Sequence, residues 1–89
     1  MLSPFLHVTR VRHLGGHRLA VAFTDGTEAE VDFSGELTGE VFEPLRDVEA
    51  FAEAYVDAET GTVAWPNGAD VAPEFLQEIG RPVAPVGLR

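Results

Sequence analysis

The sequence predicts a single small α+β domain in which an antiparallel sheet is accompanied by two short helices. The chain has 89 residues, which is enough for one domain. Hydrophobic residues alternate with polar ones over 17–33, and apolar residues after position 47 follow a helical spacing. The expected order is β-β-β-α-β-β-α: a three-stranded meander, a helix, a second hairpin and a last helix. Residues 1–80 are expected to form this domain, followed by an extended or disordered C-terminal tail over 81–89.

The first strand is expected over residues 5–14. Val8 and Val11 are three residues apart, so they cannot both face one side of a regular strand. Either a β-bulge near Thr9 and Arg10 corrects the register, or both faces of this strand are partly covered.

The next two strands are expected over 17–24 and 27–33, with their apolar residues on one face. A two-residue turn between them would place carboxylates on that apolar face, which would cost kilocalories per mole of folding free energy. A three-residue loop over 24–26 keeps each side chain on its proper face and requires φ > 0 at Gly26. The same register places Arg18 opposite Asp32.

Residues 39–45 are expected to form a short turn, because Pro44 disfavours a long helix. This turn should direct Val41, Phe42 and Leu45 to the core.

A helix of two to three turns is expected after Asp47, a favourable N-cap. Its buried stripe follows the i, i+3, i+4, i+7 pattern, which here selects Val48, Phe51, Ala52 and Tyr55.

The second hairpin is expected to join residues 55–57 to 62–65. Asp70 is expected to cap the last helix, over 71–79, and Gly80 is expected to end it.

Charge is divided unevenly along this chain of net charge −9. Residues 1–24 carry three arginines, all three histidines and no acidic residue (+3), whereas 25–89 carry three arginines and all fifteen acidic residues (−12). Cysteine is absent, which favours a cytoplasmic protein, since secreted domains of this size usually contain disulfides. No apolar run approaches the roughly 20 residues that span a bilayer, and the N-terminus lacks a secretory-signal pattern, so no membrane partner is expected.

Several segments together resemble one protein family. The segments are residues 19–23, 25–26, 31–33, 41–45, Phe51 and, most specifically, 61–74 (GTVAWPNGADVAPE). In these the chain resembles the bacterial domain-of-unknown-function family 2442, over about residues 7–78. The resemblance implies a small α+β domain, followed in some members by a helix-turn-helix segment for which this sequence has no room. It implies no activity.

The basic N-terminal hairpin is the first candidate interaction surface, and it comprises Arg10, Arg12, His13, His17 and Arg18. These side chains are suited to phosphates or to an acidic partner. The alternative is internal pairing, of Arg18 with Asp32 and of Arg12 with the acidic residues of the third strand. Internal pairing is favoured, because no aromatic residues interleave the arginines as in a single-strand binding surface.

The second candidate is a loop site, formed by Trp65, Asn67, Gly68 and Asp70. A strand end, a tight turn and a helix N-terminus meet there, and helix N-termini bind anions. The alternative is structural: Trp65 anchors the core, Asn67 and Gly68 supply the turn, and Asp70 caps the helix.

A metal site is the third possibility. With a three-residue loop over 14–16, His13 and His17 would face each other across the hairpin. Two ligands do not complete a site, so neither a metal nor another cofactor is expected.

No catalytic set is visible: the two serines lack a nucleophile-elbow setting, and no metalloprotease or phosphate-loop motif occurs. The leading hypothesis is therefore a non-enzymatic interaction domain, an accessory or regulatory partner of another protein. A homodimer through edge-to-edge pairing of the first strand is one form of it. The alternatives are a nucleic-acid-associated, toxin–antitoxin-like regulator using the basic hairpin, with nucleic acid as the less favoured partner, and a weak metal-binding domain.

Overall fold

The computed structural model describes residues 6–83 and has the predicted α+β class. Its elements are β1 (Val8–Gly15), β2 (Arg18–Phe23), β3 (Glu28–Asp32), the 3₁₀ helix η1 (Glu43–Arg46), α1 (Val48–Phe51), β4 (Tyr55–Asp57), β5 (Thr62–Ala64), α2 (Pro73–Ile79) and β6 (Arg81–Pro82). Strands β1, β2, β3 and β6 form one antiparallel sheet in that order, and β4 pairs with β5. The predicted meander, second hairpin and two helices are therefore confirmed.

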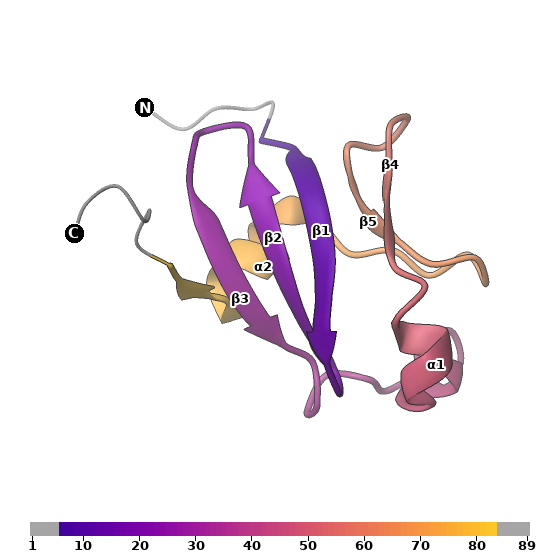
Figure 1. Cartoon of the computed structure of the whole chain (residues 1–89). Helices are drawn as coiled ribbons and strands as arrows, with labels where there is room; N and C mark the ends of the chain where they lie inside the picture. The colour runs from indigo at the N-terminus through magenta and orange to yellow at the C-terminus, as the bar shows by residue number, and fades with distance from the viewer. Residues whose placement is uncertain (1–5, 84–89) are drawn as a thin grey trace.

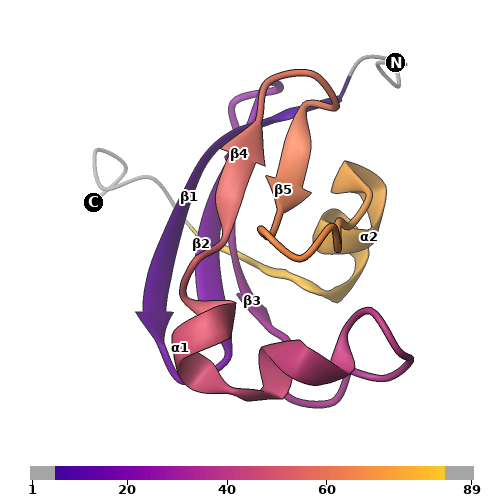
Figure 2. The same cartoon turned by 90° about the vertical axis from the view of Figure 1, so that its right-hand side faces the viewer.

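The elements form two layers around one core. Helix α2 lies behind the β1–β2–β3 meander (Figure 1), and the β4–β5 hairpin lies beside β1. In the view turned by 90°, η1 and α1 lie at the end of the sheet where β1 stops (Figure 2). One face of the meander thus meets the core, and its other face is turned away from the helices.

The register of β2 and β3 matches the sequence prediction. Leu19 faces Val31, and Arg18 faces Asp32. Apolar residues therefore line the core side of both strands, whereas the opposite side carries three acidic residues on β3 and Arg18 with two alanines on β2.

The loop between these strands has the predicted form. The Phe23 N–H donates to the Thr27 carbonyl at 2.9 Å, so the loop contains three residues. Gly26 has φ of 89°, the left-handed conformation that glycine adopts without a steric penalty.

Of the two alternatives for the first strand, the structure contains the bulge. The register of β1 against β2 shifts between Val8, which pairs with Phe23, and Arg10, which pairs with Ala22. Thr9 is the extra residue at that point, and it returns Val11 to the face occupied by Val8.

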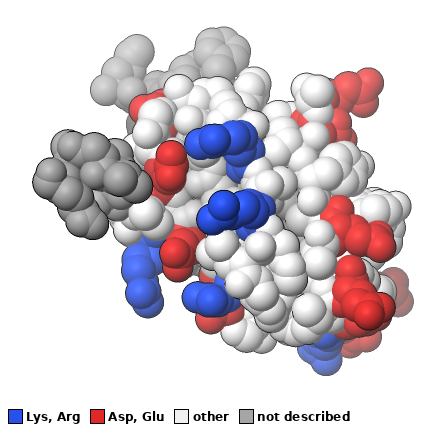
Figure 3. Space-filling model, in the orientation of Figure 1, with Lys and Arg blue, Asp and Glu red and all other residues white. Residues whose placement is uncertain are grey.

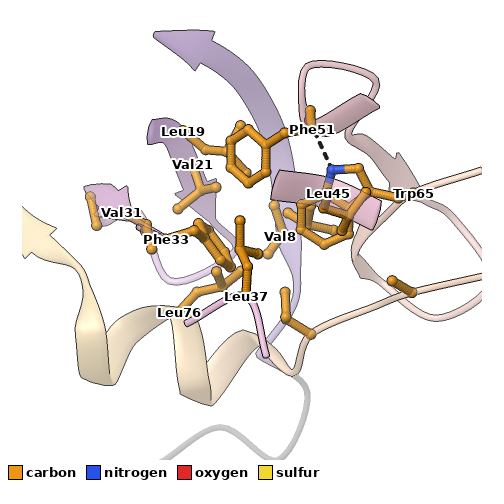
Figure 4. Close-up of a cluster of buried hydrophobic side chains, with 14 of the residues drawn as sticks. Val8, Leu19, Val21, Val31, Phe33, Leu37, Leu45, Phe51, Trp65 and Leu76 are labelled. Atoms are coloured by element: carbon orange, nitrogen blue, oxygen red, sulfur yellow. Dashed lines mark hydrogen bonds between the residues drawn. The ribbon is translucent and has the colours of Figure 1, made fainter. Parts of the chain in front are cut away.

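The core is built around aromatic rings. Trp65 is 1% exposed, and its indole N–H donates to the Phe51 carbonyl at 2.8 Å (Figure 4). The Trp65 ring lies 5.7 Å from Phe51, 5.8 Å from Phe33 and 6.3 Å from Phe42, as centroid distances. This cluster joins the meander to α1 and to the strand end after β5.

The first helix differs from its prediction. Helix α1 is one turn, Val48–Phe51, although Asp47 caps it by accepting the Glu49 N–H at 3.1 Å. Of the predicted stripe only Phe51 is buried; Val48 is 40% and Tyr55 44% exposed, and Ala52 is exposed as well. The helical stripe was wrong at Tyr55, because this residue belongs to β4 and pairs with β5, as the predicted second hairpin requires.

The preceding turn has the expected short form, the 3₁₀ helix η1. It buries Leu45 and partly buries Phe42, but Val41 is 49% exposed, contrary to the prediction. Val41 precedes the helical turn, so it does not share the face of the other two.

The last helix begins two residues later than predicted, and Asp70 does not cap it. Its N-cap is Ala72, with no side-chain cap, and Pro73 is the first helical residue. Asp70 instead forms an isolated bridge with Ala64, which keeps the chain extended there. Because a residue before proline disfavours helical angles, the helix begins at Pro73 itself.

Gly80 ends α2, as expected, but it is not left-handed, since its φ is −78°. A Cβ at this position would lie 2.6 Å from the Leu76 carbonyl oxygen and 3.1 Å from the Ala29 Cβ. The chain therefore needs glycine there for close approach of α2 to β3.

The segment expected to begin the extended tail adds a strand to the sheet. In β6, Arg81 pairs with Glu30 and Pro82 with Ala29, and the Val83 N–H donates to the Glu28 carbonyl at 3.0 Å. Residues 84–89 of the predicted tail lie outside the described residues. Within 6–83, none of the helices has the length and apolar character needed to cross a membrane.

Candidate functional site

The outer face of the meander, turned away from α2, carries an ordered set of side chains. Strand alternation and the pairing register place on it Arg10 and Arg12 from β1, Arg18, Ala20 and Ala22 from β2, Glu28, Glu30 and Asp32 from β3, and Arg81 from β6, which pairs with Glu30. We call this set the open face. Among the described residues no helix or strand lies in front of it (Figure 1).

The open face is divided into columns by charge. Arg10 and Arg12 form a basic column on β1, and Glu28 and Glu30 form an acidic column on β3. Ala20, with Ala22, separates the two columns on β2. Figure 3 looks onto this face and shows basic groups in its middle with acidic groups beside them.

A single ion pair crosses the columns among the described residues. Arg10 Nη2 lies 3.6 Å from Glu28 Oε2, with side chains 77% and 49% exposed. Such an exposed pair contributes about 0.2–1 kcal/mol, which does not fix the two side chains in place. Of the internal pairings that were predicted, neither Arg18 with Asp32 nor Arg12 with the acidic strand is among the ion pairs of the described residues.

Asp32, at one end of the acidic column, is held by its own turn. The Ser34 hydroxyl and backbone N–H both donate to Asp32 Oδ1, the latter at 2.9 Å. These hydrogen bonds, with smaller contributions from the charges of Arg18 and His17, lower the pKa of Asp32 below its ordinary value. Asp32 therefore remains an anion into mildly acidic solution.

Substitution of Ser34 by alanine is expected to raise the pKa of Asp32 toward its ordinary value of 3.8. Because the folded-state pKa is depressed, the stabilisation from Asp32 is fully present above the unfolded-state pKa and is lost as pH falls through the folded-state value. The variant should thus be less stable than the wild type above about pH 4 and approach it in stronger acid. NMR titration of the side-chain carboxyl carbons measures the shift, with Asp25, which has its own partner Thr27, as an internal control. An unchanged Asp32 titration would contradict the assignment.

A groove of about 620 Å³ begins on the open face and continues over the edge of β1. The alanines of β2 form its floor, the arginines of β1 and Glu28 its rim, and Ala54, Tyr55 and Val56 its far wall. Tyr55 is 44% exposed and lines the groove together with Arg10 and Arg12, so its ring adds an apolar surface to a charged lining. The groove therefore offers apolar contact, charge of both signs and a large aromatic side chain.

The five residues of the predicted basic surface are divided between the two faces. Arg10, Arg12 and Arg18 share the open face, whereas His13 pairs with Leu19 on the core side. The basic hairpin is therefore not a single surface.

The two histidines do not face each other, so the predicted pairing was wrong. Gly15, with φ of 112°, pairs with Arg18, which shifts the register of the hairpin end. His13 Nε2 lies 2.8 Å from the Gly16 carbonyl oxygen, and His17 Nε2 lies 2.8 Å from that of Arg46.

Both imidazole rings pack against the Phe51 ring, with centroid distances of 5.9 Å for His13 and 5.2 Å for His17. They thus hold the hairpin end against α1 and η1. Within the described chain, no three His, Asp or Glu side chains are arranged to hold a metal ion.

The predicted loop site has a structural arrangement. Trp65 is buried, Gly68 has φ of 94°, and the Asn67 side-chain oxygen accepts the Ala69 N–H at 3.1 Å. The Asn67 amide also donates to the Val41 carbonyl at 2.9 Å, which ties this turn to the segment before η1.

Sequence reasoning missed the groove. The alternation in β2 already placed two alanines opposite its apolar residues, and this was the available signal. Tyr55 was assigned to a buried helical stripe, so its position beside β1 was not expected.

Comparison with known proteins gives one family. The chain matches the family described as protein of unknown function (DUF2442) over residues 8–81. No curated protein and no solved structure matches it significantly. Because the match spans the sheet and both helices, and confirms the resemblance found in the sequence, the chain belongs to the DUF2442 family.

Proposed function

We propose that this protein is a non-enzymatic interaction domain that binds another protein molecule through the open face and the adjoining groove. The observation that carries the proposal is the alanine floor between the basic and acidic columns, beside the exposed Tyr55. A domain that binds another protein and catalyses no reaction would act as an accessory or regulatory partner of that protein.

The character of the face supports a protein partner over a nucleic acid. The acidic column lies two strands from the basic one, at a distance of about 10 Å, which is slightly more than the Debye length of about 8 Å at physiological salt. A phosphate backbone attracted by Arg10 and Arg12 would be repelled by Glu28 and Glu30. A protein surface can present both signs of charge and satisfy both columns.

Tyr55 supports the same conclusion. Tyrosine is enriched among residues that dominate binding energy, because it offers a large contact area at a small cost in conformational entropy. Here it lines the groove together with Arg10 and Arg12. Its position gives a partner an apolar anchor within a charged surface.

Photocrosslinking in the native cell tests the proposal. Tyr55 is replaced by p-benzoyl-phenylalanine, a substitution of similar shape at an exposed position. A matched control carries the same residue at Val41, which is 49% exposed and does not line the groove. We expect a protein adduct from position 55 that is absent or much weaker at position 41.

The identity of the adduct is then read by mass spectrometry. Any protein captured from position 55 and not from 41 supports binding at this face. Equal labelling at both positions, or none at position 55, would contradict the proposed function.

A further inference from the structure

We infer that the occupant of the open face is a second copy of this chain, bound face to face across a two-fold axis that runs parallel to β2. This inference rests on the proposed function and names its partner. The charge columns carry it, because their order across the sheet is self-complementary.

The order across the meander is basic, neutral, acidic. Arg12, Ala20 and Glu30 form one row across the three strands, and Arg10, Ala22 and Glu28 form the next. Both rows run in the same direction, whereas in the next row, Gly15, Arg18 and Asp32, the basic side chain lies on β2. Apart from Arg18, the central strand β2 carries no charged side chain on this face.

Symmetry selects one arrangement of two such faces. A two-fold axis parallel to β2 leaves β2 over β2 and places the β1 of each copy over the β3 of the other. The arginines of each copy then meet the glutamates of the other, on both sides of the axis. A two-fold axis perpendicular to the strands would place β1 over β1, and like charges would repel.

The two alanines make close approach of the faces feasible. Sheets that pack face to face lie about 10 Å apart, a distance that small central side chains allow. The long arginine side chains can lie across this flat centre with their charged ends at the rim. The internal pair of Arg10 and Glu28, at 3.6 Å and largely exposed, exchanges readily for pairs between copies.

Arg18 is the residue that this arrangement accommodates least directly. The two Arg18 side chains approach each other at one end of the axis, because both lie on β2. Each also has an Asp32 carboxylate on a neighbouring strand, and Gly15 opposite Arg18 leaves room beside it.

The structure favours the face over the edge of β1 as the contact. The outer edge of β1 lies along the β4–β5 hairpin, as Figures 1 and 2 show, and the Val8 N–H donates to the Gly61 carbonyl at 2.8 Å. Edge-to-edge pairing would require this hairpin to move. The open face needs no rearrangement.

The size of the face predicts a weak dimer. Strands lie about 4.8 Å apart and rise about 3.3 Å per residue. The contact area is therefore roughly 500 Å² per copy if it covers the meander together with β6 beside β3 and β4 beside β1. The total, roughly 1,000 Å², is at the lower limit of specific interfaces. We therefore expect association that depends on concentration and weakens as salt screens the columns.

Charge reversal tests the inference by sedimentation velocity from about 10 to 500 μM, a range that covers weak interfaces. The first variant is Arg10→Glu/Arg12→Glu, and the second is Glu28→Arg/Glu30→Arg. Each should self-associate at least about tenfold more weakly than the wild type, since each makes both columns of one sign. An equimolar mixture of the two should recover a heterodimer, because opposite columns then meet again.

The second variant separates the columns from net charge. It makes the chain less negative, which reduces the repulsion between whole molecules. Net charge alone would therefore strengthen its self-association, whereas the column arrangement predicts weaker self-association. The fourfold reversal Arg10→Glu/Arg12→Glu/Glu28→Arg/Glu30→Arg keeps the columns complementary and should dimerise like the wild type. Circular dichroism and thermal melting establish that all variants fold.

Several outcomes would overturn the inference. A wild-type monomer at all concentrations, or a mixture that gains nothing over its components, removes the face-to-face dimer. A crosslinked adduct from position 55 that contains a different protein removes the dimer and leaves the proposed function in place. An adduct with the chain itself supports both.

Discussion

Replacement of Trp65 by alanine is expected to cost about 3–5 kcal/mol of the free energy of unfolding, the range for large aromatic residues in a packed core. A chain of 89 residues has a total stability of roughly 5–13 kcal/mol, so the variant should be partly unfolded at 25 °C if the wild type lies at the lower end of that range. Trp65 contacts three aromatic rings and is 1% exposed, so its removal leaves a cavity that the short elements around it cannot fill. Urea denaturation followed by circular dichroism measures the loss of stability. Tryptophan fluorescence cannot be used, because Trp65 is the one tryptophan of the chain.

Trp65→Phe is the matched control. It keeps a ring in the core but removes the 2.8 Å hydrogen bond to the Phe51 carbonyl, which still accepts the Ala54 N–H at 3.3 Å. The loss of one such hydrogen bond costs about 0.5–1.5 kcal/mol, so the phenylalanine variant should fold and be less stable than the wild type. A loss below about 1 kcal/mol for the alanine variant would show that Trp65 is not the anchor of the core.

Replacement of Gly80 by alanine is the second large effect, with an expected loss of about 1–3 kcal/mol through overpacking. The added Cβ would lie 2.6 Å from the Leu76 carbonyl oxygen, 3.1 Å from the Ala29 Cβ and 3.2 Å from the Val31 Cγ2. The nearest atom belongs to the helix backbone, so no rotamer change relieves the contact. The end of α2 must move away from β3.

Gly35→Ala provides the comparison for this variant. Gly35 does not have positive φ, and a Cβ there would meet no atom within 4 Å. Alanine at that position reduces the entropy of the unfolded chain, which leaves stability unchanged or raises it by up to about 1 kcal/mol. Thermal melting of both variants compares them directly. Equal melting temperatures would show that the close approach at Gly80 is not needed.

The meander was predictable because each of its features is set locally. Alternation fixes the two faces of β2 and β3, and Gly26 supplies the left-handed residue that the three-residue loop requires. The bulge at Thr9 followed from the three-residue spacing of Val8 and Val11, although the sequence left a second explanation open.

The errors arose where distant pairing decides a local structure. Tyr55 was included both in the helical stripe and in the second hairpin, and it belongs to the hairpin alone, whereas Asp70 precedes a helix but bridges to Ala64. Likewise, Arg81 pairs with Glu30, a contact between residues about fifty positions apart, which no local pattern contains. In each case the competing contact is made by a strand whose position depends on the complete fold.

The candidate site was predictable in part. The three arginines that β1 and β2 place on the open face and the pairing of Arg18 with Asp32 followed from alternation and register. The histidine arrangement depended on the hairpin end, where two left-handed glycines, Gly15 and Gly16, changed the register. The groove also required the position of the β4–β5 hairpin beside β1, a tertiary relation between segments forty residues apart or more.

The outermost strand of the sheet has a consequence for the kind of assembly this domain can build. Strand β6 has two residues, and Pro82 has no N–H with which to extend a ladder of hydrogen bonds to another molecule. Lateral growth into a fibre is therefore blocked at that side of the sheet, while the hairpin flanks the other side. Association through the remaining broad surface ends after two molecules, because a two-fold contact consumes the same surface on both. The dimer that we propose is therefore a finite, closed particle.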